Sequence, residues 1–417
     1  MFLRTLDFNM ETETTTIKDW QKFKLIDICD FIRGSEPGTI NYNRDKGTKF
    51  IRVSDVSKGV REPLFTNIDT NKLVLVKPED VLITMDGSPG VVVRGFEGAI
   101  SSGIRKIRLK SKDFDLNFIY FLLQTESLQD IIKLHSSGVT ILHASKSIPN
   151  LQAIFPNLQE QKAIVKTLTT IKDAITGQEN LIAKLKELKQ SMMQHLFTHG
   201  IKGEKTKMTE IGEVPESWQI VPINSLSSNE MRNGAFVRRG QFGSGYLFAN
   251  VVDMYGGLYL DYKKLDRVNI SKKEIDRFIL KDGDLLFVRS SLKRDGVAQC
   301  CVVRNLQERV TYDCHLIRVE INNSLAIPEF VANYWRSEHG RRELIQRSKT
   351  TTMTTINQDG LGAAYMPLPT LKEQEGIANA LYSIDQNIEM AEKKLSVYQN
   401  LFKTLLHELM SGERRAK

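Results

Sequence analysis

Two histidines have the spacing that comes nearest to a metal site. His195 and His199 lie four residues apart, so on a helix both side chains could reach one ion. No third ligand and no His-Glu-x-x-His arrangement accompanies them, which favours a solvated helix end. Glu187 and Lys189 resemble part of a nuclease carboxylate and lysine set, but they fall inside a helical heptad pattern. The sequence therefore predicts neither a metal centre nor a nuclease site.

Cysteine and cofactor motifs lead to the same conclusion. The cysteines Cys29, Cys300, Cys301 and Cys314 form no Cys-x-x-Cys motif, which predicts reduced core residues. Cys314 and His315 are neighbours in a predicted strand, so we expect their side chains on opposite faces. The chain has no glycine-rich phosphate loop and no Asn/Asp-Pro-Pro-aromatic tetrapeptide, which an amino-methyltransferase would need. We expect a protein without catalytic activity, cofactor or metal of its own.

Composition narrows the class of protein. Hydrophobic residues make up 41% of the 417 residues and charged residues 26%, which excludes disordered and collagen-like chains. The longest apolar run, Phe118–Leu123, is far shorter than the ~20 residues that a membrane helix needs. The acidic leader at residues 1–16 lacks the features of a secretory signal. We expect a soluble, cytoplasmic protein of more than one domain, with no membrane partner.

Basic and amide residues gather on turn-like segments. The net charge of +8 permits a polyanionic partner without requiring one. Arginine and lysine can neutralise phosphates or bind guanine, whereas asparagine and glutamine suit adenine, so these turns could read a DNA groove. Any one of them could equally be an ordinary surface turn. The candidate residues of the first half are Arg33, Asn41, Tyr42, Arg44, Lys46, Ser88, Arg94, Thr140, His143 and Lys146. Those of the second half are Arg232, Asn233, Phe236, Arg238, Arg239, Gln241, Arg289, Lys293, Arg294, Arg347, Lys349, Thr351, Thr352 and Asn357.

These turns occur at equivalent positions of an internal duplication. Phe50–Val56 matches Leu247–Asp253, and further matches follow in the same order along both halves. Each half begins with short β-branched runs broken by turn residues, and one helical stretch lies near 115–134 or 327–345. We therefore expect two homologous α+β domains. Because the halves share a scaffold but not their turn residues, they suit two readers of different targets.

A long amphipathic helix follows each globular part. Apolar residues recur at an average spacing of 3.5 residues over four to five heptads, which is typical of a coiled coil. The first series is Ile164, Leu168, Ile171, Ile175, Gln178, Ile182, Leu185, Leu188, Met192 and Leu196, and the second is Ile377, Leu381, Ile384, Ile388, Ala391, Leu395, Tyr398, Phe402, Leu405 and Leu409. Each helix is expected to begin near Pro156 or Pro369 and to end at Gly200 or Gly412. A single helix of this kind could dimerise between molecules, but two in one chain favour an intramolecular antiparallel coiled coil with pseudo-twofold symmetry.

These patterns divide the chain into five segments. They are a leader at 1–16, a first recognition domain at 17–155, a first coiled-coil helix at 156–205, a second recognition domain at 206–368, and a second coiled-coil helix and tail at 369–417.

The arrangement resembles the specificity subunit of type I restriction and modification enzymes. The resemblance covers nearly the whole chain from about Ile17, and its most specific element is the doubled Pro-x-x-x-Glu-Gln start of a long heptad helix. It implies that each recognition domain reads one half of a bipartite, asymmetric site in double-stranded DNA, while the coil sets the gap. It also implies docking of two methyltransferase subunits, with restriction subunits joining them. S-adenosylmethionine, Mg²⁺ and ATP are then expected in those partners and not in this chain.

By the same resemblance, the helix starts mark partner contacts. The residues concerned are Glu160, Gln161, Glu373 and Gln374. Two alternatives remain open: a recognition module of another modification or defence enzyme, and a coiled-coil scaffold that binds only proteins.

Overall fold

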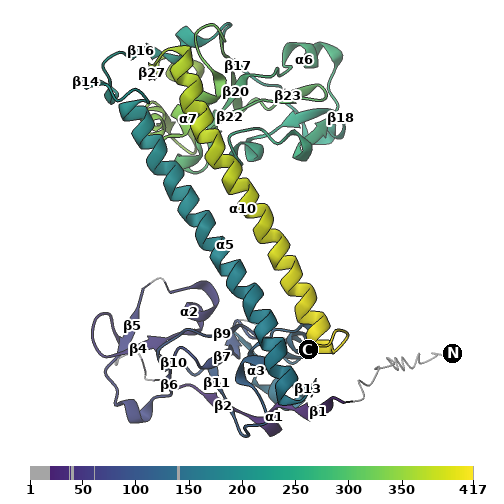
Figure 1. Cartoon of the computed structure of the whole chain (residues 1–417). Helices are drawn as coiled ribbons and strands as arrows, with labels where there is room; N and C mark the ends of the chain where they lie inside the picture. The colour runs from purple at the N-terminus through teal and green to yellow at the C-terminus, as the bar shows by residue number, and fades with distance from the viewer. Residues whose placement is uncertain (1–18, 37, 39–41, 61, 139–140, 417) are drawn as a thin grey trace, which may run out of the picture. The chain divides into compact units, whose positions relative to one another are not determined.

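The chain folds into two compact units that share two long helices. The computed structural model describes residues 19–36, 38, 42–60, 62–138 and 141–416. Unit 1 comprises Met1–Glu179 and Lys393–Lys417, and unit 2 comprises Asn180–Glu392. Helices α5 (Leu158–His199) and α10 (Leu371–Ser411) each contribute one part to unit 1 and the other part to unit 2 (Figure 1).

Short strands and helices form the globular part of each unit. In unit 1 these are β1 (Gln21–Lys24), α1 (Leu25–Ile28), β2 (Cys29–Arg33), β3 (Tyr42–Asn43), β4 (Thr48–Ile51), α2 (Val53–Lys58), β5 (Leu64–Thr66), β6 (Leu75–Val76), β7 (Val81–Thr84), β8 (Asp86–Gly87), β9 (Val92–Val93), β10 (Gly98–Ile100), β11 (Ile104–Leu109), α3 (Leu116–Leu122), α4 (Glu126–Leu134), β12 (Leu142–His143) and β13 (Gln152–Phe155). In unit 2 these are β14 (Thr206–Thr209), β15 (Gly212–Pro215), β16 (Gln219–Pro222), β17 (Arg232–Asn233), β18 (Phe242–Ala249), β19 (Asp266–Val268), α6 (Lys272–Arg277), β20 (Asp284–Val288), β21 (Ser290–Ser291), β22 (Cys300–Val302), β23 (Val310–Tyr312), β24 (Leu316–Glu320), α7 (Pro328–Arg336), α8 (Glu338–Gln346), β25 (Lys349–Thr350), β26 (Thr354–Thr355), α9 (Gln358–Gly362) and β27 (Tyr365–Leu368).

The two globular parts have the same central topology. Unit 1 holds an antiparallel sheet in the order β2-β11-β7-β9, and unit 2 holds its counterpart in the order β17-β24-β20-β22. The strand before each long helix also pairs alike, since β13 joins β1 and β27 joins β16. A parallel strand pair, β4 with β10 or β18 with β23, belongs to a further sheet in each unit. The expectation of two related α+β domains is confirmed.

Each helical stretch predicted inside the globular parts is a pair of helices. The stretch near 115–134 is divided into α3 and α4 at Thr125, whose backbone is extended. The stretch near 327–345 is divided into α7 and α8 at Ser337, whose Oγ accepts a hydrogen bond from the Gly340 backbone N–H. Thr125 and Ser337 each stand at the N-cap of a second helix. The expectation of a single helix was therefore wrong in both stretches.

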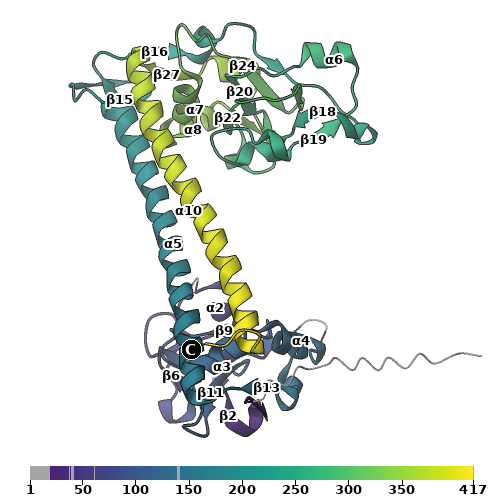
Figure 2. The same ribbon diagram turned by 45° about the vertical axis from the view of Figure 1, so that its right-hand side comes forward.

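The long helices pack against each other in antiparallel fashion. In unit 1 the core combines Ile164 and Leu168 of α5 with Leu405 and Leu409 of α10. In unit 2 the core combines the end of α5, including Leu196, with the start of α10. The start of one helix therefore lies beside the end of the other in each unit (Figures 1 and 2). The predicted intramolecular coiled coil is confirmed.

One predicted seam residue is placed elsewhere. Leu188 is 49% exposed, and Lys189 lies beside α10 with its Nζ 2.6 Å from Asp385 Oδ1. Leu188 lies six residues after the buried Ile182, which places its side chain about 120° from Ile182 around the helix axis. Lys189 lies seven residues after Ile182, so its side chain points within about 20° of the same direction. Both helices end as predicted, because Gly200 and Gly412 adopt positive φ angles of 64° and 79°.

Buried glutamines join the starts of the long helices to the globular parts. Gln161 Oε1 accepts the Asp115 N–H at 2.9 Å, and Gln161 Nε2 donates to the Pro156 carbonyl at 2.9 Å. Gln374 Oε1 accepts the Ile327 N–H at 2.8 Å, and its Nε2 donates to the Pro369 carbonyl at 2.9 Å. Asp115 and Ile327 are the residues that precede α3 and α7. Each glutamine therefore fixes one short helix to the coil.

We predict that Gln374→Ala lowers the free energy of unfolding by roughly 3 kcal/mol, because it leaves the part-buried Ile327 N–H and two carbonyl groups without partners. Gln399→Ala on the exposed face of the same helix is the control and should change stability by no more than about 0.5 kcal/mol. Urea unfolding followed by circular dichroism measures both. Equal effects of the two substitutions would contradict the role of Gln374.

Candidate nucleic-acid interface

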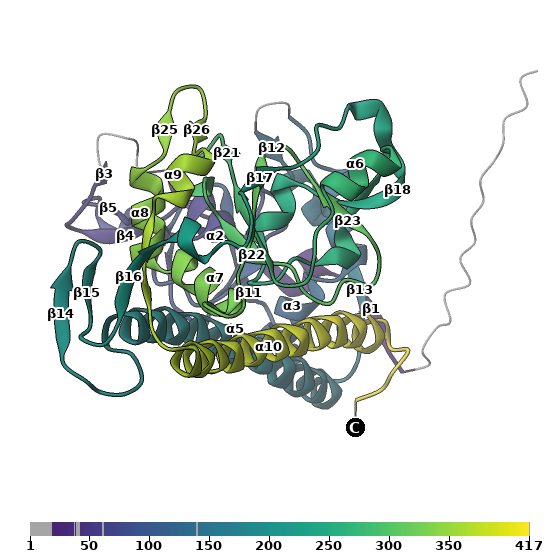
Figure 3. The same ribbon diagram turned by 90° about the horizontal axis from the view of Figure 1, so that it is seen from above.

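Two of the three predicted loops meet through strand pairing in each unit. In unit 1, β8 pairs with β12, which places Asp86 opposite His143. In unit 2, β21 pairs with β26, which places Ser290 opposite Thr355 and Ser291 opposite Thr354. Strands β8 and β21 directly follow the central strands β7 and β20. Within unit 2, β21, β25 and β26 lie away from the long helices (Figure 3).

The remaining loop reaches the same end of the sheet. In unit 1, Arg33 Nε donates to the Ser102 carbonyl at 3.3 Å, and Ser102 Oγ donates to Glu36 at 2.8 Å. In unit 2, Gln358 Nε2 donates to Asn233 Oδ1 at 2.9 Å. The three predicted loops therefore converge at one end of the central sheet in each unit, although sequence distances of up to 125 residues separate the atoms concerned.

The unit 1 candidates differ in how free their side chains are. Arg44 is largely exposed, and its nearest carboxylate, Glu62, lies 4.0 Å away. His143 Nδ1 lies 2.8 Å from Asp86. Tyr42 donates to Glu36, and burial together with this carboxylate raises the pKa of its hydroxyl to about 12. Arg33, Lys46 and Lys146 are exposed or half-buried and Ser88 is half-buried, while Asn41 and Thr140 lie outside the described residues.

Arg94 does not join this group. Strand β9 runs antiparallel to β7, with Val93 opposite Leu82. Arg94 therefore follows β9 toward the start of β7, whereas β8 follows its end. Its guanidinium lies 4.3 Å from the centroid of the Tyr120 ring on α3. The sequence placed Arg94 next to Ser88, but the fold takes them to opposite ends of one strand.

Most unit 2 candidates lie on the surface, and a few are held internally. The exposed candidates are Arg232, Phe236, Arg238, Arg239, Lys293, Arg294, Lys349, Thr351, Thr352 and Asn357. Gln241 is tied to the Asn269 carbonyl, and Arg347 forms an ion pair with Glu343 at 2.6 Å. Arg289 is half-buried, and its Nε has no hydrogen-bond partner among the described residues.

A hollow of about 700 Å³ opens between the loops of unit 2. Ser290, Ser291, Tyr255 and His315 line it with polar atoms, and Leu292 at its edge is 81% exposed. Sequence reasoning did not assign Tyr255, Leu292 or His315 to the site. Only Leu292 gave a signal, as an apolar residue inside a basic turn. The hollow combines hydroxyl groups, an imidazole and apolar surface, which suits contact with base edges.

The Cys314 and His315 side chains lie together, contrary to the expectation of opposite faces. These residues belong to a turn before β24, so strand alternation does not apply to them. The Cys314 Sγ lies 3.6 Å from His315 Nδ1, which is also 2.7 Å from Asp313 Oδ1. The pKa of the Cys314 thiol is raised, mainly because the thiol is partly buried.

The four helix-start residues predicted to contact partners are buried within this chain. Glu160 pairs with Arg415 at 2.6 Å and Glu373 pairs with Lys202 at 2.7 Å, while Gln161 and Gln374 form the bonds to α3 and α7 described above. The structure thus gives these side chains an internal role that the sequence did not reveal.

Sequence reasoning also missed Arg105, a buried residue that connects two turns of unit 1 through hydrogen bonds. Arg105 is only 5% exposed, and its guanidinium donates to the Ser102 carbonyl at 2.6 Å and to Ser145 Oγ at 2.8 Å. Burial lowers the pKa of this arginine. Its place in β11, among alternating apolar residues, gave no sign of a polar role.

Comparison with known proteins finds similarity to specificity subunits of type I restriction enzymes. Residues 17–187 match the family described as "Type I restriction modification DNA specificity domain". The chain is 26% identical to the specificity subunit of type I restriction enzyme MjaVIII from Methanocaldococcus jannaschii, covering 96% of this chain and 94% of that one. It is 25% identical to the EcoKI specificity subunit from Escherichia coli, covering 94% and 88%.

A solved structure shares the fold. The S subunit of the type I restriction-modification system from M. genitalium superimposes with a TM-score of 0.58 at 14% identity, covering 94% of this chain and 96% of that one. The chain is thus similar in sequence and in fold to type I restriction-modification specificity subunits, as the sequence resemblance predicted. Within the part of the chain that the structure describes, no helix combines the length and hydropathy that crossing a membrane requires.

We predict that Arg105→Met loosens the loop at 142–145 without unfolding unit 1, because it removes the bonds to Ser102 and Ser145 and keeps an apolar stem. Hydrogen exchange at the His143 and Ala144 amides should accelerate roughly ten-fold or more. Arg108→Met, on an exposed side chain of the same strand, is the control. Unchanged exchange at these amides would show that Arg105 does not support the loop.

Proposed function

We propose that this chain is the DNA specificity subunit of a type I restriction-modification complex, with no chemistry of its own. One observation carries the proposal: in each unit, three equivalent loops converge at the equivalent end of the central sheet. The side chains of these loops differ between the two units. The similarity to specificity subunits over nearly the full chain supports it. The two units then read the two halves of a bipartite, asymmetric site.

Exposed cations and loop side chains would divide the work of binding. Arg44, Lys46, Lys293 and Arg294 are exposed, which suits contacts to phosphates that supply affinity without sequence information. The Asp86–His143 pair of unit 1 offers hydrogen-bonding groups, whereas the unit 2 hollow adds apolar surface beside Ser290. Because these surfaces differ chemically, each unit suits a different base sequence.

The coil and its ends would serve the assembly of the complex. We propose that the paired helices set the distance between the half-sites and that two methyltransferase subunits dock near Glu160, Gln161, Glu373 and Gln374, through exposed residues beside these buried ones. Restriction subunits would join this complex, and S-adenosylmethionine, Mg²⁺ and ATP would bind to the partners. Its place of action would be the cytoplasm, where bacterial and archaeal DNA is accessible.

We predict that exchanging residues 206–368 for the equivalent segment of a relative changes one half of the recognised DNA sequence and leaves the other half unchanged. The physical reason is that the loops of unit 2 are held within unit 2. Sequencing that maps methylated adenines in a host expressing the complex measures the outcome. A change in both halves would contradict separate readers, and methylation without sequence preference would contradict the proposed function.

We predict that four residues inserted after Leu185 and four after Met390 widen the gap between the half-sites by about two base pairs. These positions face each other in the register set by the Lys189–Asp385 pair. The insertion lengthens the coil by about 6 Å, against about 3.4 Å per base pair. A control insertion in the hairpin between Thr209 and Gly212 should leave the gap unchanged. An unaltered gap in the coil variant would exclude the coil as the spacer.

A further inference from the structure

Two cations in unit 1 share one aromatic ring. Arg94, Asn117, Tyr120 and Lys172 form a cluster between α3 and α5, which we call the Arg94–Lys172 site. The Arg94 guanidinium carbon lies 4.3 Å from the Tyr120 ring centroid, and Lys172 Nζ lies 4.4 Å from it. Arg94 also bonds to Asn117 Oδ1, and Lys172 bonds to the Tyr120 hydroxyl. Both positive charges are therefore held within 4.4 Å of the centre of one ring.

The charges of these two residues are not neutralised locally. Among the described residues of unit 1, no carboxylate forms an ion pair within 4.0 Å of either group. Asp173 and Asp115 act on Arg94 only at longer range. Burial lowers the pKa of both groups, and Arg94 lowers the pKa of Lys172 further. Placing two like charges in partly buried positions is unfavourable unless an anion compensates them.

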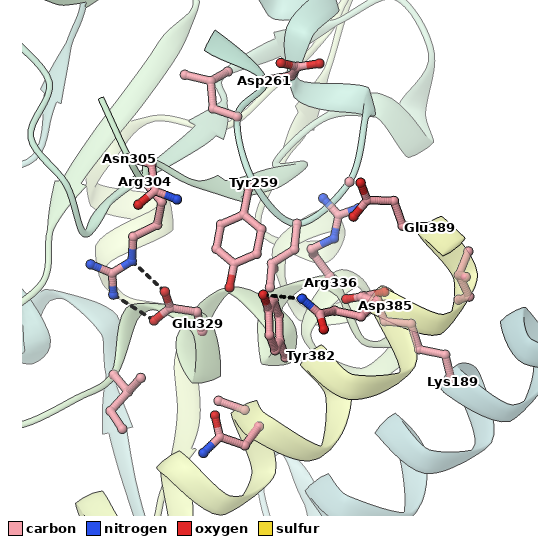
Figure 4. Close-up of a pocket in the computed structure, with 18 of the residues that line it drawn as sticks. Lys189, Tyr259, Asp261, Arg304, Asn305, Glu329, Arg336, Tyr382, Asp385 and Glu389 are labelled. Carbon is pink, nitrogen blue, oxygen red and sulfur yellow. Dashed lines mark hydrogen bonds and ion pairs between the residues drawn. The ribbon is translucent and has the colours of Figure 1, made fainter. Parts of the chain in front are cut away.

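The equivalent positions of unit 2 carry their own anions. Counting from the two buried glutamines, Lys172 corresponds to Asp385, and counting from the residues before α3 and α7, Asn117 corresponds to Glu329. Glu329 accepts two bonds from Arg304, at 2.6 and 3.0 Å, and Asp385 pairs with Lys189. These pairs line an open hollow of about 990 Å³, into which Tyr259 points beside Tyr382 (Figure 4).

The charge also differs at two further positions of this face. Lys162 and Lys166 of α5 correspond to Glu375 and Asn379 of α10. Lys162 also lines a smaller hollow in unit 1 together with Lys110 and Lys112. Unit 1 therefore carries lysines at three positions of this face where unit 2 carries two acidic residues and one neutral residue.

The Arg94–Lys172 site lies apart from the proposed DNA-reading loops. Arg94 is at the start of β7, whereas β8 and β12 lie beyond its end. Within unit 1, α3 lies beside α5, and β12 lies away from it (Figure 3). We therefore expect an anionic group bound at this site to belong to a protein docked on the coil and not to DNA held by the loops.

We propose that the Arg94–Lys172 site receives an acidic side chain, Asp or Glu, of a protein partner, and that the equivalent surface of unit 2 rejects the same segment. This inference rests on the proposed function only in its choice of partner, a methyltransferase subunit. Two copies of one partner would then bind the two units with different affinities, because one docking face lacks an anion and the other already contains it.

Asn117→Glu tests the site by giving Arg94 an internal carboxylate, as Glu329 does for Arg304. The probe is the purified methyltransferase subunit titrated onto the full chain by calorimetry at low salt. We expect one of the two association constants to fall about ten-fold, which is about 1.4 kcal/mol. The melting temperature should stay the same or rise, since the new ion pair lies inside the chain. A purely structural site would give the rise in stability without the loss of binding.

Two further variants test whether the effect depends on the charge of Lys172 and on its position in α5. Lys172→Met keeps the stem over Tyr120 and removes the charge, and it should weaken the same association. Lys184→Glu, an exposed lysine later in α5, should leave both association constants unchanged.

Three outcomes decide between a protein site and a DNA site. If DNA affinity falls while both methyltransferase subunits bind normally, the site is a phosphate site and the proposal is wrong. If both association constants are unchanged in Asn117→Glu, the proposal is also wrong. A chain that assembles as predicted but shows no sequence-specific methylation would contradict the proposed function and not this inference.

Discussion

The fold depends on how each long helix is fixed where it begins. A helix of 42 residues can in principle leave a globular domain in many directions, and its apolar seam alone does not choose among them. Gln161 and Gln374 restrict this freedom because each amide bonds to the backbone before α3 or α7 and to a carbonyl at the helix start. Both glutamines are almost fully buried, so losing these bonds would leave polar groups unsatisfied in the core. The same contact therefore joins the globular part to the coil in unit 1 and in unit 2.

The glutamine bonds hold the globular part of each unit to the coil and do not involve the loops at the end of the central sheet. The side chains of these loops can therefore differ between the units. The central strands β7 and β20 are fully buried, whereas β8 and β21, which follow them, lead into the turns of the proposed interface. Asp86 and His143 occupy one pair of positions, and Ser290 and Thr355 occupy the other. A common backbone with different side chains is what two readers of different DNA sequences require.

The duplication is less symmetric in charge than in backbone. Arg94 and Arg304 both lie near the start of the central strand, but only Arg304 has a carboxylate beside it among the described residues. The coil face that carries Lys172 in unit 1 carries Asp385 in unit 2. Duplicated surfaces of this kind bind the same molecule differently, because electrostatic complementarity is set by side chains and not by the fold.

Local pattern determined the large features of this protein. The repeat of matched segments, the 3.5-residue periodicity and the glycines at 200 and 412 were sufficient to predict two α+β parts and an intramolecular coil, because each depends on spacing along the chain. The exact seam depended on helical rotation, so Leu188 was misplaced. Tertiary structure alone decided the partners of polar side chains: Gln374 bonds to a backbone group 47 residues away, Arg105 reaches a serine 40 residues away, and antiparallel pairing carries Arg94 away from Ser88. Such contacts join residues that are distant in sequence, and no periodicity encodes them.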